Sequence, residues 1–269
     1  MKRPAARPPA GIVGRLRAGV LALLLAGAPA AADVTGPDDR TAPSAEEQAM
    51  LTGVGVIYPD GTLGGTAFLV GACEVLVTAR HTILDERGRP RADRFLYYPG
   101  NGDRAIEVLL TGSITGRTGR ETDDWIVMRL AEPDPGCRPM IVWSVPDPDM
   151  AALAEEGFDN AAFHADRDGL TVSRGCTVAP ECRAAAVTGP TFTHDCDTDV
   201  GASGSPLYVL SPAGPAVFGM HIRGHGPAGD ICSRSNLALR ITGPFHEAIR
   251  EMLTRAPEPA GPRRHHRGG

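Results

Sequence analysis

Short apolar runs separated by turn residues recur along most of this chain, and no other feature limits its fold as strongly. The 269 residues include 33 glycines and 24 prolines, which favour turns and so keep strands short. The runs between them are rich in Val, Ile, Leu and Thr, which favour β-strands. They predict strands at 52–58, 62–70, 74–78, 105–111, 125–130, 140–143, 207–210 and 216–222. Because no helical pattern alternates with these strands, we predict an all-β fold and not a βαβ series.

One helical pattern stands out near the end of the chain. Between Pro244 and Thr254, the residues Phe245, Ile249 and Met252 recur at a spacing that places them on one helix face. Proline is favoured in the first turn of a helix, where Pro244 stands. The predicted architecture is therefore mostly β with a C-terminal helix.

The first 32 residues have the three parts of a secretory signal peptide. Five basic residues precede an apolar run, 18–28, and small residues follow it up to Ala32. The run has 11 residues, whereas a membrane-spanning helix needs ~20, so we expect cleavage and not an uncleaved anchor. We predict an exported protein, extracellular or periplasmic, without a membrane anchor.

The rest of the chain divides by composition into three parts. Residues 33–47 are expected to form a loose lead-in, with a propeptide as one interpretation. Residues 48–255 are expected to form one domain, and 256–269 a disordered tail. Residues 1–32 hold five of the 27 basic residues and none of the 32 acidic ones, so the remainder carries a net charge of −10. This acidity argues against a nucleic-acid-binding surface.

The cysteines of an exported chain are expected to form disulfide bonds, because oxidising compartments favour them. The six are Cys73, Cys137, Cys176, Cys182, Cys196 and Cys232. Six cysteines permit 15 full pairings. Cys176 and Cys182 are close in sequence and flank a turn, so we expect them to pair; Cys196 with Cys232 is the next expected pair, which leaves the first two. No CxxC spacing indicates a metal site, and no cofactor is expected.

Three segments combine residue types that occur in catalytic sites. His81 follows an apolar strand, Asp124 opens another, and Ser203 lies in a glycine-rich loop. Each alone has a structural explanation: a solvated turn histidine, a carboxylate before a strand, a flexible loop. Their order, at separations of 43 and 79 residues, favours chemistry. A serine hydroxyl needs an imidazole base, and the base needs a carboxylate that orients it.

These segments resemble those of the chymotrypsin/trypsin-like serine peptidases, in particular the bacterial branch that includes the glutamyl endopeptidases. The resembling residues are Thr-Ala-Arg-His81, Asp124-Trp-Ile-Val, Gly201-Ala-Ser-Gly-Ser-Pro-Leu and the strand 217–224. The resemblance covers roughly four-fifths of the chain. It implies two six-stranded antiparallel β-barrels with the active site in the cleft between them.

The resemblance also implies a role for each residue. Ser203 is the expected nucleophile, His81 the general base and acid, and Asp124 the carboxylate that holds the imidazole. Asp123 is the alternative carboxylate, but Asp124 abuts the strand as the matching family residue does. The backbone N–H groups of Gly201 and Ser203 are expected to form the oxyanion hole.

Two residues depart from the family pattern. Ala202 stands where trypsin and chymotrypsin carry the aspartate that pairs with a new N-terminal ammonium. We therefore expect activity without such an ion pair. Arg80 replaces the usual small residue before the histidine, so a bulky side chain must find room there.

The residues of the expected substrate pocket give two conflicting indications of substrate preference. Thr198 and His221 match the pair that binds the substrate carboxylate in glutamyl endopeptidases, and both can donate hydrogen bonds to it. Asp197 matches the aspartate that selects Lys or Arg in trypsin; Arg223, which precedes Gly224, is a candidate to neutralise it. The bland interpretation is that Asp197 faces solvent while Thr198 and His221 bond each other. We expect acidic residues before the cut bond, with basic and small or apolar ones as alternatives.

Taken together, these features predict an exported serine endopeptidase that cleaves protein or peptide substrates through an acyl-enzyme and acts as a monomer. The alternative is a non-catalytic peptide- or protein-binding module on the same fold. A quality-control protease with further peptide-binding modules is less favoured, because only 66 residues follow Ser203.

Overall fold

The structure is a computed structural model. It describes residues 34, 36–100, 102, 104–117, 120–224, 232 and 235–256. The expected signal peptide, 1–32, and all but the first residue of the expected tail lie outside these residues. Among the helices of the described part, none is long and apolar enough to cross a membrane.

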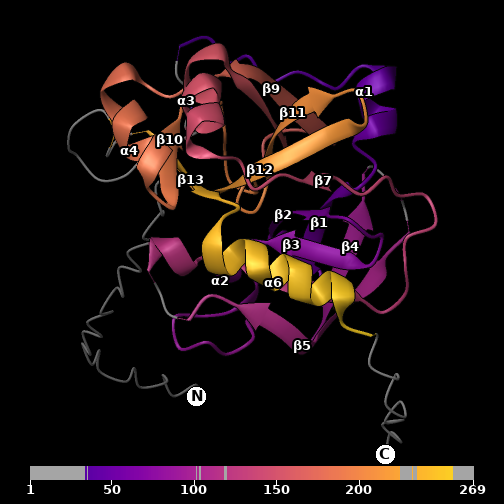
Figure 1. Cartoon of the computed structure of the whole chain (residues 1–269). Helices are drawn as coiled ribbons and strands as arrows, with labels where there is room; N and C mark the ends of the chain where they lie inside the picture. The colour runs from indigo at the N-terminus through magenta and orange to yellow at the C-terminus, as the bar shows by residue number, and fades with distance from the viewer. Residues whose placement is uncertain are drawn as a thin grey trace, which may run out of the picture.

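The first half of the described chain forms a closed six-stranded antiparallel barrel, coloured indigo to magenta in Figure 1. Its strands are β1 (Val54–Pro59), β2 (Gly65–Leu69), β3 (Val75–Thr78), β4 (Phe95–Pro99), β5 (Ile106–Thr115) and β6 (Ile126–Leu130), ordered β1-β2-β3-β6-β5-β4. Every residue of β3 is buried. Leu76 faces the barrel interior, and Val77 faces the cluster shared with the second half of the molecule. Burial on both faces explains why these runs are apolar without alternation.

The second half forms a seven-stranded sheet instead of the expected second closed barrel. Its strands are β7 (Ile141–Val142), β8 (Phe158–Phe163), β9 (Leu170–Cys176), β10 (Thr191–His194), β11 (Pro206–Ser211), β12 (Gly214–Arg223) and β13 (Asn236–Arg240). The order is β10-β13-β12-β11-β8-β9, and β7 pairs in parallel with β12. The end strands β9 and β10 are joined by hydrogen bonds between Thr177 and Asp195, not by a strand ladder. One backbone hydrogen bond and two to the Asp195 carboxylate therefore connect the two ends of this sheet.

The disulfide bonds correct two of the expected pairings. Cys73 pairs with Cys137, Cys176 with Cys196, and Cys182 with Cys232. Cys176 ends β9 and Cys196 lies just beyond β10, so their Cα atoms are 5.0 Å apart where the two ends of the sheet meet. The expected pairs Cys176–Cys182 and Cys196–Cys232 are therefore wrong. Proximity in sequence suggested them, whereas the meeting of the sheet ends decides the partners.

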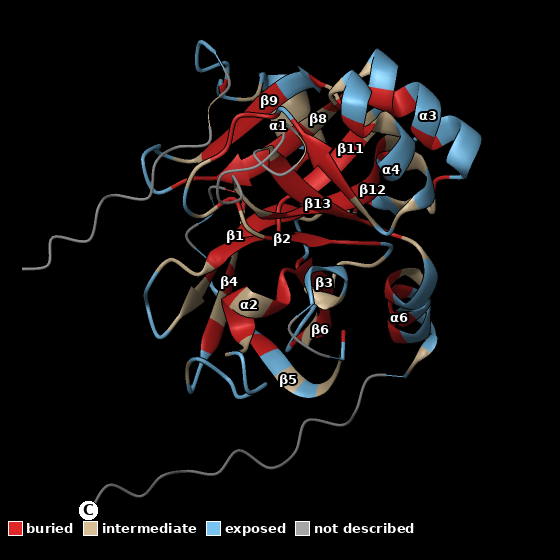
Figure 2. Ribbon diagram, turned by 90° about the vertical axis from the view of Figure 1, so that its left-hand side faces the viewer, coloured by how far each residue is buried: buried red, intermediate tan, exposed pale blue. Residues whose placement is uncertain are grey.

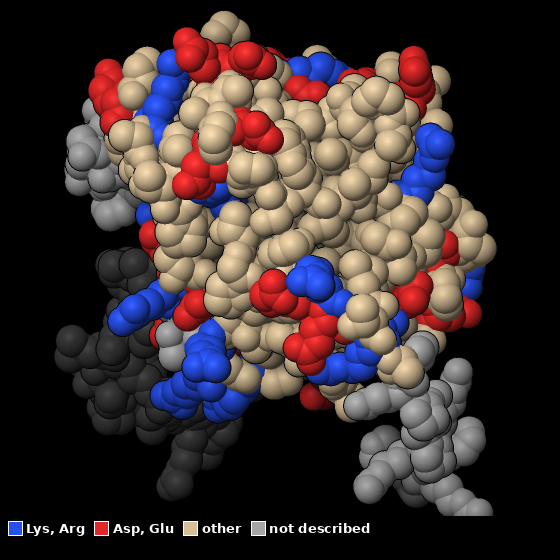
Figure 3. Space-filling model, in the orientation of Figure 1, with Lys and Arg blue, Asp and Glu red and all other residues tan. Residues whose placement is uncertain are grey.

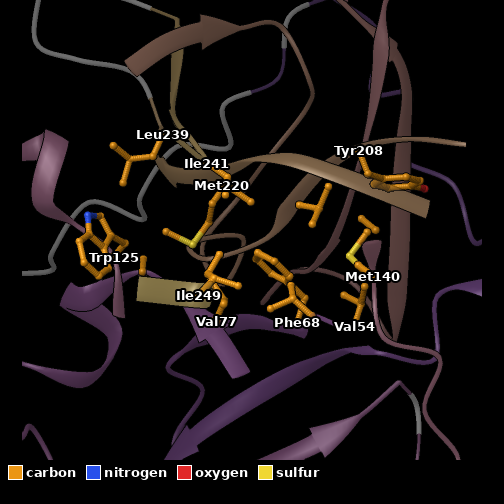
Figure 4. Packing of buried hydrophobic residues seen from close by; sticks show 14 of the residues in the cluster. Val54, Phe68, Val77, Trp125, Met140, Tyr208, Met220, Leu239, Ile241 and Ile249 are labelled. Atoms are coloured by element: carbon orange, nitrogen blue, oxygen red, sulfur yellow. The ribbon is translucent and has the colours of Figure 1, made fainter. Parts of the chain in front are cut away.

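The predicted C-terminal helix is present as α6 (Gly243–Thr254). Phe245, Ile249 and Met252 are buried, as expected, and Figure 2 shows the helix buried on the side toward the strands and exposed on the other. The Phe245 ring stacks on Trp125 with centroids 5.2 Å apart. Figure 4 shows the shared core in which α6 joins both halves through Val77, Ile249 and Met220.

In the described part of the chain the other helices are short, and all but the first lie in connections between strands. They are α1 (Ala45–Met50), α2 (Arg80–Ile83), α3 (Asp147–Glu156) and α4 (Arg183–Thr188), with single turns of 3₁₀ helix, η1 (Glu121–Asp123) and η2 (Pro180–Cys182). The side of the molecule in Figure 3 carries acidic and basic side chains around a broad uncharged centre.

The part of the lead-in that the structure describes is held to the second sheet by hydrogen bonds. Arg40 is only 6% exposed, and the backbone of Thr41 exchanges two hydrogen bonds with Val172 on the outer edge of β9. An edge strand exposes unpaired N–H and C=O groups, and Thr41 satisfies those of Val172. Ser44 and Glu47 then form a capping box at the start of α1.

Candidate active site

The structure brings His81 and Asp124 together at one end of the first barrel. His81 lies in α2, directly after β3, and Asp124 lies just before β6. These two strands are neighbours, with Thr78 opposite Ile126, so both side chains emerge at the same edge. His81 Nδ1 is 2.7 Å from Asp124 Oδ2, and the His81 amide donates to Oδ1 of the same carboxylate at 2.9 Å. A ring that donates its Nδ1–H to the carboxylate keeps Nε2 as a proton acceptor.

The loop that carries Ser203 is seated on the strands leading to His81. The Thr66 amide donates to the Ser203 carbonyl oxygen at 2.9 Å. Gly204 has a φ of +88°, and a Cβ there would collide with Thr78 Oγ1 and the Thr66 carbonyl oxygen. Only glycine therefore lets the loop approach the barrel so closely. Ser203 Oγ lies 3.4 Å from the carbonyl oxygen of Ile222 in β12.

The backbone on either side of the serine has the features of an anion-binding turn. Gly201 has a φ of +101°, and its carbonyl oxygen accepts a hydrogen bond of 2.8 Å from Thr66 Oγ1. The Ala202 amide is used within the loop, where it donates to the Asp199 carbonyl oxygen at 3.0 Å. Within the described part of the chain, the amides of Gly201 and Ser203 donate to no protein group. These two N–H groups remain available for an oxyanion.

The neighbouring residues that the sequence singled out are occupied elsewhere. Asp123 ends η1 and is not the carboxylate that contacts His81. Arg80, for which the sequence required space, is buried beneath the turn near Gly88. Arg223 forms an ion pair of 2.7 Å with Glu121, so it does not neutralise Asp197.

Asp197 and Thr198 are both buried, at 2% and 1% exposure, so Asp197 does not face solvent. The Asp197 carboxylate points to the lead-in, where its Oδ2 accepts the Asp39 amide at 2.8 Å. Its own amide donates to Ser173 Oγ in β9 at 3.1 Å. Asp197 is thus tied to the lead-in and to β9.

His221 is bonded to a residue that the sequence did not reveal. Its Nδ1 is 3.0 Å from Nε2 of His194, at the end of β10. His194 carried no motif signal, because it ends an ordinary short strand and becomes relevant only when β10 and β12 come together across β13. The expected mutual bond of Thr198 and His221 is therefore not the contact that His221 Nδ1 makes.

Burial keeps both imidazoles neutral. It lowers the pKa of His194 to about 3 and, helped by nearby positive groups, holds the pKa of His221 well below its usual range. His194 Nδ1 is buried without a partner in the described structure. A bare ring nitrogen is less costly in this place than an unsatisfied N–H. We therefore assign the shared proton to His194 Nε2, which leaves His221 with a hydrogen on Nε2.

A hollow of about 490 Å³ opens beside the serine loop. A Cβ on Gly201 would lie 3.1 Å from Leu63 Cδ2 and 3.4 Å from His164 Cα, and both residues line the hollow. Its wall includes the aromatic pair Tyr58 and Tyr98, whose ring centroids are 5.3 Å apart. The hollow, whose lining also includes Arg167 and Asp168, is thus a space of mixed polarity next to the candidate oxyanion hole.

Comparisons with known proteins agree with this architecture. The sequence matches no protein-family model and no curated protein. The structure is similar to a Glu endopeptidase solved in complex with MPD, with a TM-score of 0.63 and 17% identity over 82% of this chain and 100% of that chain. It is also similar to the thermostable serine protease AL20 from an extremophilic microorganism, with a TM-score of 0.56 and 15% identity over 77% of this chain and 100% of that one. The chain therefore has the fold of the trypsin-like serine peptidases, as its sequence motifs predicted.

Proposed function

We propose that this protein is an exported serine endopeptidase that uses Ser203, His81 and Asp124. The observation that carries the proposal is the pair of hydrogen bonds, 2.7 and 2.9 Å, by which one carboxylate holds both the ring and the backbone of His81. The seating of the serine loop against the same barrel edge supports it. The three disulfide bonds support export, because oxidising compartments favour them.

The proposed reaction has two halves. Ser203 Oγ attacks the substrate carbonyl carbon while its proton passes to His81 Nε2, and the oxygen that becomes negative accepts hydrogen bonds from the Gly201 and Ser203 amides. The C–N bond then breaks, and the leaving amine takes the proton from His81. Water repeats the sequence on the acyl-enzyme and releases the acid. Asp124 holds the ring and stabilises the imidazolium in both halves.

For the residue before the cut bond, the site favours a side chain that accepts hydrogen bonds. The inferred His221 Nε2–H and the Thr198 hydroxyl are donors, which suits glutamate or glutamine. Asp197 does not oppose this choice, because its carboxylate is directed to the Asp39 amide. We therefore propose acidic substrates first, as in the Glu endopeptidase that the structure resembles. The peptide after the cut bond would lie in the hollow beside Gly201.

A fluorophosphonate probe tests the proposal. The full chain should react covalently and Ser203→Ala should not, whereas a non-catalytic binding module would show no labelling in either. His81→Ala and Ser203→Ala should each lose ~10⁶-fold in turnover, as in comparable triads. Asp124→Asn should lose ~10⁴-fold, or about 5.5 kcal/mol of barrier. Asp123→Asn is the matched control and should stay within a few-fold of the original; a reversal of the two Asp variants would show that the acid is misassigned.

Peptides that differ only in the residue before the cut bond test the preference. Cleavage after Glu should exceed cleavage after Arg and Ala, and His221→Phe should remove most of that advantage. A preference for Arg that disappears in Asp197→Ala would contradict the proposed pocket.

A further inference from the structure

The lead-in contains a segment that contacts the loop before the nucleophile, strand β9 and the turn that carries Asp166. Residues 38–41, here called the strap, are absent from the hydrophobic clusters of the described residues. In Figure 1 the indigo chain ahead of α1 runs along the second sheet beside β9. The strap therefore adds polar contacts to one place on the molecule and little to its core.

One end of the strap fixes the beginning of the serine loop. The Asp39 amide donates to Asp197 Oδ2 at 2.8 Å. Ser173 of β9 completes the connection, since its hydroxyl donates to Asp39 Oδ1 at 2.7 Å and accepts the Asp197 amide at 3.1 Å. Thr41 holds this arrangement in register through its two backbone hydrogen bonds with Val172. The Asp197 carboxylate and amide are both tied by these contacts.

Arg40 fixes the middle of the same loop through a second route. Its side chain is 1% exposed, and its guanidinium lies 2.8 Å from carboxylate oxygens of both Asp38 and Asp166. The turn that carries Asp166 bonds directly to the loop, because the Ala165 amide donates to the Val200 carbonyl oxygen at 2.7 Å. The Asp199 amide also donates to Nδ1 of His164 in this turn, at 3.2 Å. Val200 immediately precedes Gly201, whose amide donates to no protein group among the described residues.

The residue next to the serine explains why such support is needed. In trypsin-like enzymes that become active on cleavage, an aspartate at this position receives the new N-terminal ammonium, but Ala202 is apolar and fully buried. We propose that the strap takes over this work: Asp39 and Arg40 act as positioning residues that hold 197–201 so that the Gly201 and Ser203 amides face the oxyanion. This inference rests on the proposed peptidase function. It also makes the lead-in a permanent part of the active enzyme and not an inhibitory propeptide.

Hydrogen exchange tests the strap without relying on activity. In the Ser203→Ala background, Arg40→Gln should speed hydrogen exchange of the amides in 197–203 at least ~10-fold, because the ion pairs of Arg40 with Asp38 and Asp166 are lost. Exchange of the amides in β1–β6 should not change. Arg167→Gln is the matched control, since Arg167 also pairs with Asp38 and Asp166 but its side chain is 42% exposed. It should leave exchange in 197–203 unchanged. If the amides in 197–203 exchange at the same rate in the Ser203→Ala chain and in both Arg variants made in it, the inference is wrong.

Kinetics on the active chain supply a second readout. Loss of an oriented oxyanion donor costs ~10²–10³ in kcat, so Arg40→Gln should lower kcat by about that factor with a smaller change in KM. A chain starting at Pro37 should keep full activity, and one starting at Ala42 should behave like Arg40→Gln. Higher activity in the shorter chain would instead identify an inhibitory propeptide and overturn the inference. If the exchange results hold but the full chain does not react with fluorophosphonate, the proposed function is wrong while the strap contact stands.

Discussion

The second half contains two disulfide bonds, and we expect the one that contributes more to stability to contribute less to catalysis. Cys176–Cys196 closes a segment of 20 residues and Cys182–Cys232 one of 50. In the chain-entropy model, the first contributes about 3 kcal/mol and the second about 4 kcal/mol, because the longer loop loses more freedom when it is closed. Stability alone therefore ranks Cys182–Cys232 as the more important bond.

Catalysis should rank the bonds the other way. Cys196 directly precedes Asp197, and its partner Cys176 ends β9, so this bond joins the start of the serine loop to the strand that carries Ser173. Removal of Cys176–Cys196 should lower kcat/KM and weaken the preference for the residue before the cut bond. Cys182 lies in η2, and its bond leaves the Ser173–Asp197 contact intact.

The assay compares two double alanine variants with the original chain. Urea unfolding is measured in the Ser203→Ala background, so that self-cleavage does not interfere, and kcat/KM is measured on the active versions under conditions in which each is folded. The expected result is a larger loss of unfolding free energy without Cys182–Cys232 and a larger loss of kcat/KM without Cys176–Cys196. If both quantities fall more in the same variant, the assignment of separate roles is wrong.

Two predictions concern pH. The ratio of kcat/KM for Glu over Gln peptides should stay constant from pH 6 to 8, because burial holds the pKa of His221 low and its neutral Nε2–H donates to the substrate without a change of protonation. Taking the ratio cancels the titration of the triad, and a ratio that falls as pH rises would show that the imidazole must take up a proton when Glu binds. Burial, with a contribution from Asp197, raises the pKa of Asp39. The contribution of Asp39 to the free energy of unfolding is therefore fully present at low pH and is lost as pH rises through that raised pKa. Asp39→Asn keeps the amide that binds Asp197 but does not ionise, so its unfolding free energy relative to the original chain should increase between pH 4 and 8; a decrease would show that the sign is wrong.

Much of the fold was predictable because its apolar runs are strong local signals. The predicted strands 74–78 and 125–130 became β3 (Val75–Thr78) and β6 (Ile126–Leu130), and the predicted helix became α6. The strands that the sequence did not reveal depend on contacts formed only in the folded chain. Strand β8 contains the buried Asn160, whose side-chain amide donates to Ser205 Oγ at 2.8 Å, a partner 45 residues away. Such a residue signals a loop until its distant partner is in place.

In the candidate site, too, local sequence signals predicted some features and contacts in the folded chain decided the others. The sequence by itself predicted His81, Asp124 and Ser203 as the proposed triad, because acyl transfer by a serine requires these residue types and the adjacent glycines indicate a loop with unusual backbone angles. The strands before His81 and after Asp124 were also local signals, so a shared barrel edge followed from their pairing.

The tertiary structure alone decided what surrounds these residues. The partner of His221, the orientation of Asp197 and the pairing of Cys176 all depend on which strand ends meet. The strap depends on it as well, because the edge of β9 and the Asp166 carboxylate that pairs with Arg40 come from segments more than a hundred residues away. These hydrogen bonds, ion pairs and disulfide bonds join groups that are close in space but distant in sequence. Polar groups, unlike apolar runs, have no periodic sequence pattern from which their partners can be predicted.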